Sequence, residues 1–498
     1  MADSAFWLPL VIAIPLLTAI IIFLLPRWSF YLAAAGSVLK GIAVLILTVL
    51  FIEAGPVRHT IGGWGAPLGI DLVLDGISLL MLLLTTVVGA AITIYAYGYF
   101  RSETGDDHKQ HQRNFFWPLW MFLIAALNGL FLSGDVFNLY VTLELLGFSA
   151  VALTALAGKP NVLKAAMRYL LVSLSGSLLY LMGVVFLYGG FGTLDIANLG
   201  TVVNESPALL VAAALTTVGL VMKTALFPLH FWLPPAHANA AAPVSALLSA
   251  LVVKGSFYIL LRLWMEVFYP LGDTVVPQML SIFGAGAVIW GSVQAIMQPR
   301  LKLLVAYSTV AQLGYLFLLM PILMADRTNL IALAGILCFV LAHAVAKASA
   351  FLSAGNILFA TNDDRIKSLV GLTRSLPMTF TAFTLAAVSL TALPPSGGFV
   401  AKWLMLDTVL DNRYWGIGIV IIGGGLLAAV YNMRVITNFF RQAEKTGSAD
   451  IAVTGAVTAL PLAMVVPTIS LAVLALLLGF AGGYVLELLS IGLMESGL

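Results

Sequence analysis

Long apolar stretches separated by short polar connections make up almost the whole chain. A membrane-spanning helix needs about 20 mainly apolar residues to cross roughly 30 Å of hydrocarbon, and a window of that length finds fourteen such stretches. They lie near 6–25, 31–53, 70–98, 115–133, 136–157, 166–190, 207–227, 241–264, 276–297, 303–323, 329–357, 377–410, 415–440 and 453–483. The pattern predicts an all-α polytopic membrane protein with about 14 transmembrane helices, numbered here in chain order.

The polar connections are too short for an extramembrane domain. The longest run from Arg101 to Asn114 and from Arg441 to Asp450, which excludes a nucleotide-binding or redox domain within this chain. The composition is 61% hydrophobic and 9% charged, whereas soluble chains are about 45–50% apolar and about 25% charged. A net charge of +2 supplies no basic field for nucleic acid. The single cysteine, Cys338, excludes disulfides, iron–sulfur clusters and cysteine-based zinc sites, so no cofactor or metal is expected.

Lys and Arg are distributed unevenly between alternate connections, and such an excess marks the cytoplasmic side. Connections after odd-numbered helices hold fifteen: Arg27, Arg101, Lys109, Arg113, Lys159, Lys164, Arg168, Arg300, Lys302, Arg365, Lys367, Arg374, Arg434, Arg441 and Lys445. Connections after even-numbered helices hold four: Arg58, Arg262, Arg327 and Arg413. Both termini are therefore predicted to face away from the cytoplasm. The first helix is not a cleavable signal, because the residues before it include Asp3 and no base.

Five lysines remain inside predicted helices: Lys40, Lys223, Lys254, Lys347 and Lys402. A lysine at the centre of a membrane helix costs about 2.5–3.5 kcal/mol on insertion scales, so these groups need to face protein or water. Two further ionisable residues share this depth. Glu144 lies in helix 5, and His343 precedes Lys347 by four residues on one face of helix 11. Together the buried groups predict a polar path through the membrane.

Each of these residues also has a purely structural interpretation. Glu144 and Lys223 are compatible with a static ion pair, and His343 with a hydrogen-bonded core histidine. Lys40 is compatible with a lysine that reaches an interface, because nothing else polar marks helix 2. His230 and His237 flank a proline-rich stretch at a spacing that suits neither a metal site nor a catalytic triad, which favours a loop or a channel mouth.

A buried lysine is well suited to carry protons. Burial lowers the pKa of a lysine and a nearby carboxylate raises it, so a small displacement of the carboxylate changes whether the amine keeps its proton. Arginine stays charged and cannot act in this way. A row of such groups can pass protons through bound water.

Two helices are interrupted by proline and glycine deep within the apolar region. The interruptions are KTALFPLH at 223–230 in helix 7 and LPPSGGFVAK at 393–402 in helix 12, and broken helices in corresponding positions indicate inverted repeats. We therefore divide the chain into helices 1–3 (1–114), a first five-helix repeat of helices 4–8 (115–264), a second of helices 9–13 (276–440) and helix 14 (441–498). Because five is an odd number, the second unit enters the membrane from the side opposite to the first, and the two units have inverted topologies.

Four motifs resemble one protein family. They are FNLYVTLE at 137–144, KTALFPLHFWLPPAH at 223–237, APVSALLSALVVK at 242–254 and LPPSGGFVAK at 393–402. The chain resembles the antiporter-like subunits shared by respiratory complex I, membrane-bound hydrogenases and Mrp-type cation/proton antiporters. WGAPLGID at 64–71 makes it most similar to the D-type subunit of the Mrp antiporters.

The resemblance implies a function for the buried groups. Glu144 matches the helix-5 glutamate, Lys223 the helix-7 lysine, Lys254 the connecting helix-8 lysine and Lys402 the terminal helix-12 position, and His343 with Lys347 falls on the linking stretch of helix 11. Lys40 and Cys338 match nothing in the family. The implied protein is a proton-translocating subunit in a bacterial or archaeal cytoplasmic membrane, with other membrane subunits, protons, a monovalent cation and the lipid bilayer as partners.

Three alternatives remain. The same proton path could be driven by a redox complex that resembles complex I or a hydrogenase. A membrane-embedded transferase is a second alternative, although its site would need a catalytic residue near the interface and a substrate-binding loop. A transporter that acts without partner subunits is the third.

Overall fold

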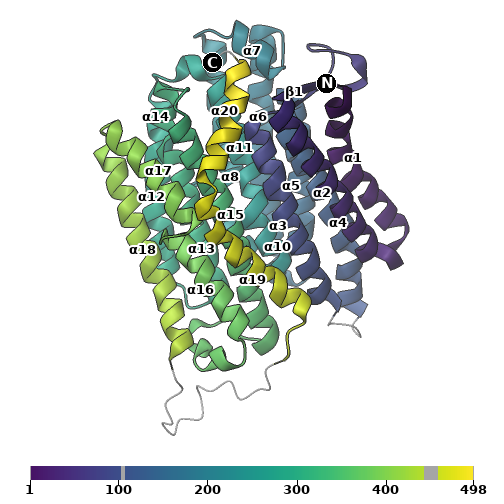
Figure 1. Ribbon diagram of the computed structural model, residues 1–498, viewed down its shortest axis with the longest axis vertical. Helices are drawn as coiled ribbons and strands as arrows, with labels where there is room; N and C mark the ends of the chain where they lie inside the picture. Colours follow the sequence, from purple (N-terminus) through teal and green to yellow (C-terminus); the bar gives the residue numbers. More distant parts are fainter. Residues whose placement is uncertain (1, 102–106, 442–457, 497–498) are drawn as a thin grey trace.

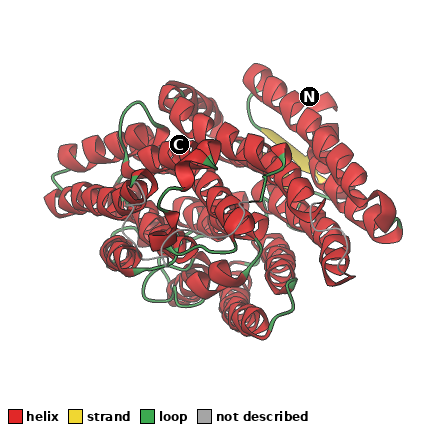
Figure 2. Ribbon diagram, turned by 90° about the horizontal axis from the view of Figure 1, so that it is seen from below, coloured by secondary structure: helices red, strands yellow, loops and turns green. Residues whose placement is uncertain are grey.

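The computed structural model describes residues 2–101, 107–441 and 458–496. Their helices form an upright bundle (Figure 1) whose cross-section is elongated in a view along the helix axes (Figure 2). The helices are α1 Ala2–Leu24, α2 Ser29–Ala54, α3 Gly76–Arg101, α4 Asp107–Leu132, α5 Val136–Ala155, α6 Pro160–Phe191, α7 Ile196–Val202, α8 Pro207–Thr224, α9 Leu233–Asn239, α10 Ala242–Leu247, α11 Val253–Glu266, α12 Val276–Met297, α13 Leu301–Leu318, α14 Met320–Ala325, α15 Leu330–Thr361, α16 Pro377–Thr391, α17 Gly397–Asp411, α18 Trp415–Phe440, α19 Leu462–Leu477 and α20 Gly482–Ser496.

The predicted membrane architecture is confirmed. In the described ranges, thirteen helical segments are long and apolar enough to cross a membrane, and α16 with α17 forms the remaining predicted crossing. α1 begins and α20 ends at the same end of the bundle, which is uppermost in Figure 1.

The lead-in to the third predicted helix is a hairpin rather than helix. β1 Val57–Thr60 pairs antiparallel with β2 Asp71–Leu74, and α3 begins only at Gly76. The apolar window that placed a helix over 70–98 cannot distinguish the short run DLVL from a helical turn, and the glycine-rich stretch before it forms the turn of the hairpin.

The C-terminal helix also differs from the prediction over 453–483. Residues 453–457 lie outside the described residues; α19 begins at Leu462, and after a 3-10 turn at Leu478–Phe480 the chain continues as α20. The turn has a packing reason, because a Cβ added to Gly479 would lie 1.7 Å from the Pro395 carbonyl oxygen. The lack of a side chain at Gly479 thus allows the turn after α19 to pack closely against the loop between α16 and α17.

Both predicted breaks are present, and they share one local geometry. Ala225 (φ 60°) caps the end of α8 and Ala392 (φ 64°) caps the end of α16, each in the left-handed region. Each alanine N–H donates to carbonyl groups three and four residues earlier, which satisfies a helix end as a left-handed cap does. α9 and α17 follow these breaks. The breaks leave backbone polar groups available inside the bundle, where protein rather than lipid can satisfy them.

Glycines bring α8 and α13 close to their neighbours. A Cβ on Gly219 of α8 would lie 2.3 Å from the Gly176 carbonyl oxygen of α6, and a Cβ on Gly314 of α13 would lie 2.3 Å from the Gly284 carbonyl oxygen of α12. Small residues at such crossings allow the close backbone packing that associates helices in membranes. These contacts fix α8 and α13, which carry much of the site described next.

Candidate functional site

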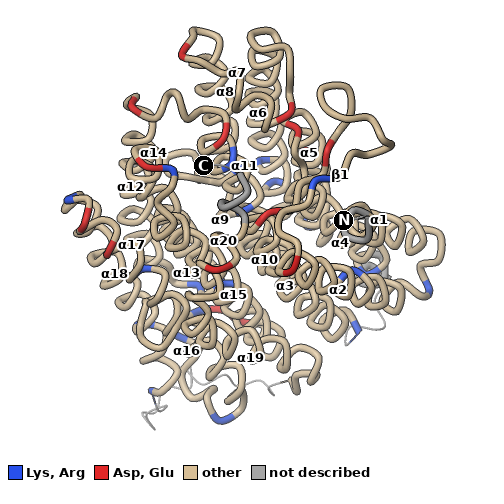
Figure 3. The backbone as a smooth tube through the Cα atoms, turned by 45° about the horizontal axis from the view of Figure 1, so that its top comes forward, with Lys and Arg blue, Asp and Glu red and all other residues tan. Residues whose placement is uncertain are grey.

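Charged residues occur both at the two ends of the bundle and in its interior. Figure 3 shows acidic segments gathered towards the upper end and basic segments more often lower down. Between the ends, the structure buries five of the six residues predicted for a polar path, with Lys254 and Lys347 at 0% exposure, and leaves the Glu144 side chain 16% exposed. We call Glu144, Lys223, Lys254, His343, Lys347 and Lys402, with the polar groups that bind them, the buried row.

One end of the row is an ion pair. Lys223 Nζ lies 2.9 Å from Glu144 Oε1, and the Ser177 hydroxyl donates to the same carboxylate oxygen. Lys223 stands in the last turn of α8, where the negative end of the helix dipole favours a cation. Gly176 leaves room for its stem, because a Cβ there would lie 3.2 Å from Lys223 Cγ. The predicted pair therefore forms, beside a hydroxyl that can hold the carboxylate when the lysine is neutral.

A small cavity follows Lys223 on the side of α11. It has a volume of about 10 Å³ and is lined by Lys223, Ser173 and Ser256 among others, which is close to the least volume that holds one water. The Thr224 hydroxyl donates to Ser256 Oγ at 2.9 Å. Polar groups thus continue from α8 to α11, the helix of Lys254.

Lys254 follows a π-helical turn at Leu248–Val252. Its amine donates to the Ser249 carbonyl within that turn, and the Ser249 hydroxyl lies 3.0 Å from the Thr309 hydroxyl of α13. π-helical turns interrupt α-helices frequently at functional sites. Here the turn supplies the carbonyl that accepts from the completely buried amine.

Lys347 contacts the same helix α13. Its amine donates to the Val305 carbonyl at 3.1 Å and to the Ser308 hydroxyl. No carboxylate of the described residues pairs with Lys254 or Lys347, and the two lysines repel one another electrostatically. Charging both at once is therefore unfavourable.

The other end of the row lies between α13, α15 and α17. Lys402 Nζ is 4.1 Å from the centre of the Tyr315 ring and has no hydrogen-bond partner among the described residues. His343 stacks on Phe339 with ring centres 5.8 Å apart and interacts electrostatically with Lys254, Lys347 and Lys402. Both of its ring nitrogens lack partners in the described part of the chain. His343 is thus a titratable group surrounded by three buried lysines.

One face of α13 supplies polar contacts that the sequence analysis did not identify. It carries Ser308, Thr309, Gln312 and Tyr315, all at 2% exposure or less. Gln312 Nε2 donates to the Leu390 carbonyl and to a tyrosine hydroxyl of α18, each at 3.3 Å. The recurrence of these polar residues every three to four positions in an apolar helix was a usable signal.

A second buried branch leaves the row towards the lower end of the bundle. His237 is completely buried, stacks on Phe351 at 4.6 Å and interacts electrostatically with Lys254, Lys347 and Lys302. Lys302 was expected in a connection, but it lies in the first turn of α13 at 4% exposure and donates to the Ala240 carbonyl. The prediction for Lys302 is wrong because α13 begins at Leu301, two residues before the predicted start at 303, so that Lys302 belongs to the first turn of the helix.

Two of the singled-out residues are not part of the row. His230 lies between α8 and α9 at 9% exposure, with its ring 5.6 Å from Phe227. Lys40 of α2 donates to the Thr86 hydroxyl of α3 at 2.9 Å. Thr86 itself donates to the Leu82 carbonyl. Lys40 therefore serves as a hydrogen-bonded contact between α2 and α3, which accounts for its burial without a role in the row.

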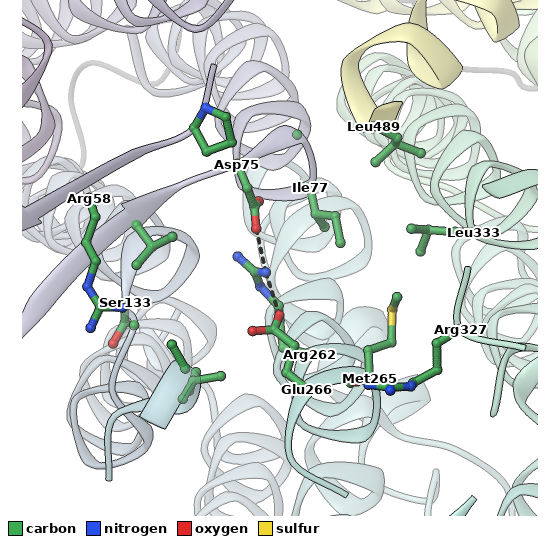
Figure 4. Close-up of a pocket in the computed structure, with 16 residues that line it drawn as sticks. Arg58, Asp75, Ile77, Ser133, Arg262, Met265, Glu266, Arg327, Leu333 and Leu489 are labelled. Atoms are coloured by element: carbon green, nitrogen blue, oxygen red, sulfur yellow. Dashed lines mark hydrogen bonds and ion pairs between the residues drawn. The ribbon is translucent and has the colours of Figure 1, made fainter. Parts of the chain in front are cut away.

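Another cavity lies outside the buried row, at the end of α11 (Figure 4). It has a volume of about 450 Å³, and Arg262 at the end of α11 binds both Asp75 and Glu266 at its wall. Arg262 Nε also donates to the Tyr258 hydroxyl at 3.1 Å. This network joins α11 to the start of α3, so a fixed cation stands between the cavity and Lys254.

The comparisons with known proteins agree with this arrangement. Residues 133–428 match the family described as NADH:quinone oxidoreductase/Mrp antiporter, TM, and residues 64–116 match NADH-Ubiquinone oxidoreductase (complex I), chain 5 N-terminus. The N subunit of the NADH-quinone oxidoreductase of Desulforudis audaxviator is 36% identical over 86% of this chain and 86% of its own length. The D subunit of the Na(+)/H(+) antiporter of Alkalihalophilus pseudofirmus is 29% identical over 89% of this chain and 88% of its own.

Solved structures show the same fold. A chain of the Mrp complex from Dietzia sp. DQ12-45-1b superposes with a TM-score of 0.87 at 25% identity, covering 100% of this chain and 99% of that one. A chain of respiratory complex I from Thermus thermophilus gives a TM-score of 0.74 at 24% identity over 96% and 98%. The chain belongs to the transmembrane family shared by NADH:quinone oxidoreductases and Mrp antiporters.

Proposed function

We propose that this chain is the proton-translocating membrane subunit of a multisubunit monovalent cation (Na⁺)/H⁺ antiporter. Protons pass between Lys223, Lys254, Lys347 and Lys402, with His343 among them and Glu144 controlling Lys223. The observation that carries the proposal is the series of polar contacts on α8, α11 and α13 that lies between the Glu144–Lys223 pair and Lys402. Similarity to the D subunits of two Na(+)/H(+) antiporters supports the cation assignment.

The ion pair is the element that can switch. While Glu144 holds Lys223 at 2.9 Å, the carboxylate stabilises the charged amine. When the carboxylate turns to the Ser177 hydroxyl alone, Lys223 loses that stabilisation in a low-dielectric site, where the interaction is much stronger than in water. The proton then moves towards Lys254, and each occupied lysine disfavours protonation of the next.

The branch through His237 supplies access from the basic end. Lys302 interacts electrostatically with Asp364 and Arg300, which lie in the connections at that end, and His237 interacts with Lys302 on one side and with Lys254 and Lys347 on the other. A neutral imidazole can accept a proton at one nitrogen and release one from the other. His237, assigned from sequence to a channel mouth, is thus proposed to link bulk water to the middle of the row.

Replacing His237 by phenylalanine tests this access route. The ring stack on Phe351 is retained while both nitrogens are removed, so we expect an assembled complex whose initial proton flux falls at least tenfold, in line with the loss of a proton-transfer group. His59→Phe, which changes a histidine in β1, is the matched control and should transport normally. Full flux through His237→Phe would exclude the route.

The charge distribution supports a proposed orientation in the membrane. The basic end of the bundle is proposed to face the cytoplasm of a bacterial or archaeal cell, with both termini on the opposite side. Multisubunit complexes among the structural relatives support a hetero-oligomer with other membrane subunits. A redox-driven complex is the second candidate, because the 36% identical relative belongs to an NADH-quinone oxidoreductase.

The deciding experiment is purification of the native complex in mild detergent, identification of its other chains and reconstitution into liposomes. We expect Na⁺, K⁺ or Li⁺ gradients to drive proton movement without any electron donor. Partner chains with redox centres, together with proton pumping that requires an electron donor and quinone or another acceptor, would instead establish the redox-driven alternative.

A further inference from the structure

A separate pocket lies at the basic end of the bundle, away from the buried row. Its volume is about 300 Å³, and it is bounded by the turn between α1 and α2, the end of α3 and the first turns of α4. Arg27, Arg101 and Arg113 line it, and no Asp or Glu of the described residues does. Three guanidinium groups around one hollow predict an anionic ligand, because guanidinium matches phosphate and carboxylate geometry.

The other polar groups around the pocket are also donors. α2 begins here at Ser29 without a side-chain cap, so the positive end of a 26-residue helix adjoins the pocket. Trp117 lines the pocket at 1% exposure, and its indole N–H has no acceptor among the described residues. An anion in this pocket would therefore lie close to hydrogen-bond donors of α2, α3 and α4, and no carboxylate of the described residues lines the pocket to compete with it.

The wall of the pocket is formed by packed aromatic rings. Phe30 stacks on Tyr97 with ring centres 3.9 Å apart and meets the edge of Trp117 at 5.5 Å. Arg101 donates to the Tyr97 hydroxyl and lies over its ring. These contacts hold one arginine in place, while Arg27 and Arg113 have no ion pair with any described carboxylate.

The surroundings of the pocket identify the source of the anion. Leu24 is 69% exposed, Leu25 52%, Trp28 62% and Tyr31 62%, so the turn between α1 and α2 presents apolar and aromatic surface outwards. The pocket residues also stand at the ends of three candidate membrane spans. Aromatic residues with basic residues at that depth are typical of the headgroup region, and an acyl chain can lie along the exposed flank of α2.

We propose that this pocket binds the phosphate of an anionic phospholipid headgroup, with Arg27 and Arg113 as its principal cationic contacts. Basic pockets between transmembrane helices on the cytoplasmic side bind such headgroups, and the proposed orientation puts this pocket in that leaflet. The bound lipid joins the α1–α2 turn to α3 and α4, since its phosphate contacts arginines of all three segments.

Lipid titration of the purified, delipidated complex tests the proposal. The thermal midpoint is recorded against added phosphatidylglycerol, phosphatidylcholine and inorganic phosphate. We expect phosphatidylglycerol alone to raise it. In the double variant Arg27→Gln/Arg113→Gln the apparent affinity should fall about thirtyfold, since each arginine near the surface contributes about 1 kcal/mol.

Arg168→Gln/Arg374→Gln is the matched control, because it removes two exposed arginines of the same end outside the pocket. It should respond as the wild type does. Equal losses in the two double variants would mean that lipid is attracted by net charge alone, and an equal effect of inorganic phosphate would show a soluble anion site. Either result overturns the proposal, as does full affinity in Arg27→Gln/Arg113→Gln. Native mass spectrometry of the complex gives a second readout through the number of retained anionic lipids.

Discussion

Replacing Lys223 by alanine is expected to abolish proton-coupled transport while the complex still assembles. The change removes the group that Glu144 modulates across 2.9 Å. Glu144 keeps the Ser177 hydroxyl and is 16% exposed, so its carboxylate is not left completely buried without a partner. Glu144→Ala should have the same effect on transport, because Lys223 then lacks the only carboxylate that binds it in the described chain. The measurement is proton flux into liposomes under a cation gradient, with assembly checked by size-exclusion chromatography.

Lys40→Ala provides the matched control. It also removes a buried helical lysine, but one whose amine binds Thr86 between α2 and α3 rather than a member of the row. Its flux should stay near the wild-type value. Normal antiport by both assembled variants, Lys223→Ala and Glu144→Ala, would rule out the proposed role of the pair.

Replacing Lys254 by arginine is expected to be nearly as damaging as removing its charge. Lys254 is completely buried and binds the Ser249 carbonyl of the π-helical turn. A guanidinium can keep a hydrogen bond and a charge there, but it does not release its proton near neutral pH. If Lys254 carries protons, Lys254→Arg and Lys254→Met should both lose at least 90% of the flux, about a tenfold fall that corresponds to 1.4 kcal/mol in the barrier.

The two variants together separate transport from structure. Arginine is larger than lysine, and overpacking can destabilise a core, whereas methionine is smaller and apolar. Assembly of Lys254→Met without flux therefore excludes a packing artefact, and Lys40→Arg controls for the larger side chain in a membrane helix. Wild-type flux through Lys254→Arg would show that this lysine acts only as a fixed charge.

The sequence was sufficient for the membrane architecture and for the identity of the ionisable groups. Both follow from transfer energies, because apolar length and the cost of buried charge are properties of local sequence. The two breaks were equally readable, since Pro228 and Pro395 cannot continue a regular helix. The hydrophobic pattern gave the wrong secondary structure at two places. At β2 a short apolar run forms a strand instead of a helical turn, and at the end of α19 the contact of Gly479 with Pro395 accompanies a 3-10 turn.

The contacts between the ionisable groups could not be predicted in the same way. Lys223 and Glu144 are 79 residues apart, and their pairing depends on how α5 packs on α6 and how α6 meets α8 at Gly176 and Gly219. The role of α13 was missed because Ser308 and Gln312 are uncharged and cost little in hydropathy, although the Ser308 hydroxyl binds Lys347 and the Gln312 amide donates to the Leu390 carbonyl. Lys302 was predicted in a connection because the hydrophobic pattern does not fix the first residue of a helix to better than a few positions. A start at Leu301 instead of 303 places the lysine in the helix, where it is buried.

The buried row has a carboxylate, Glu144, at one end only, so its two ends differ in how well they stabilise a positive charge. At the Glu144 end, a proton arriving on Lys223 completes a neutral pair; at the Lys402 end, where an aromatic ring is the neighbour, a proton adds an uncompensated charge. The same proton is therefore more stable at one end of the row than at the other before any gradient is applied. In the proposed mechanism, energy from outside the chain has to move the proton across that difference, and displacement of Glu144 from Lys223 begins the transfer.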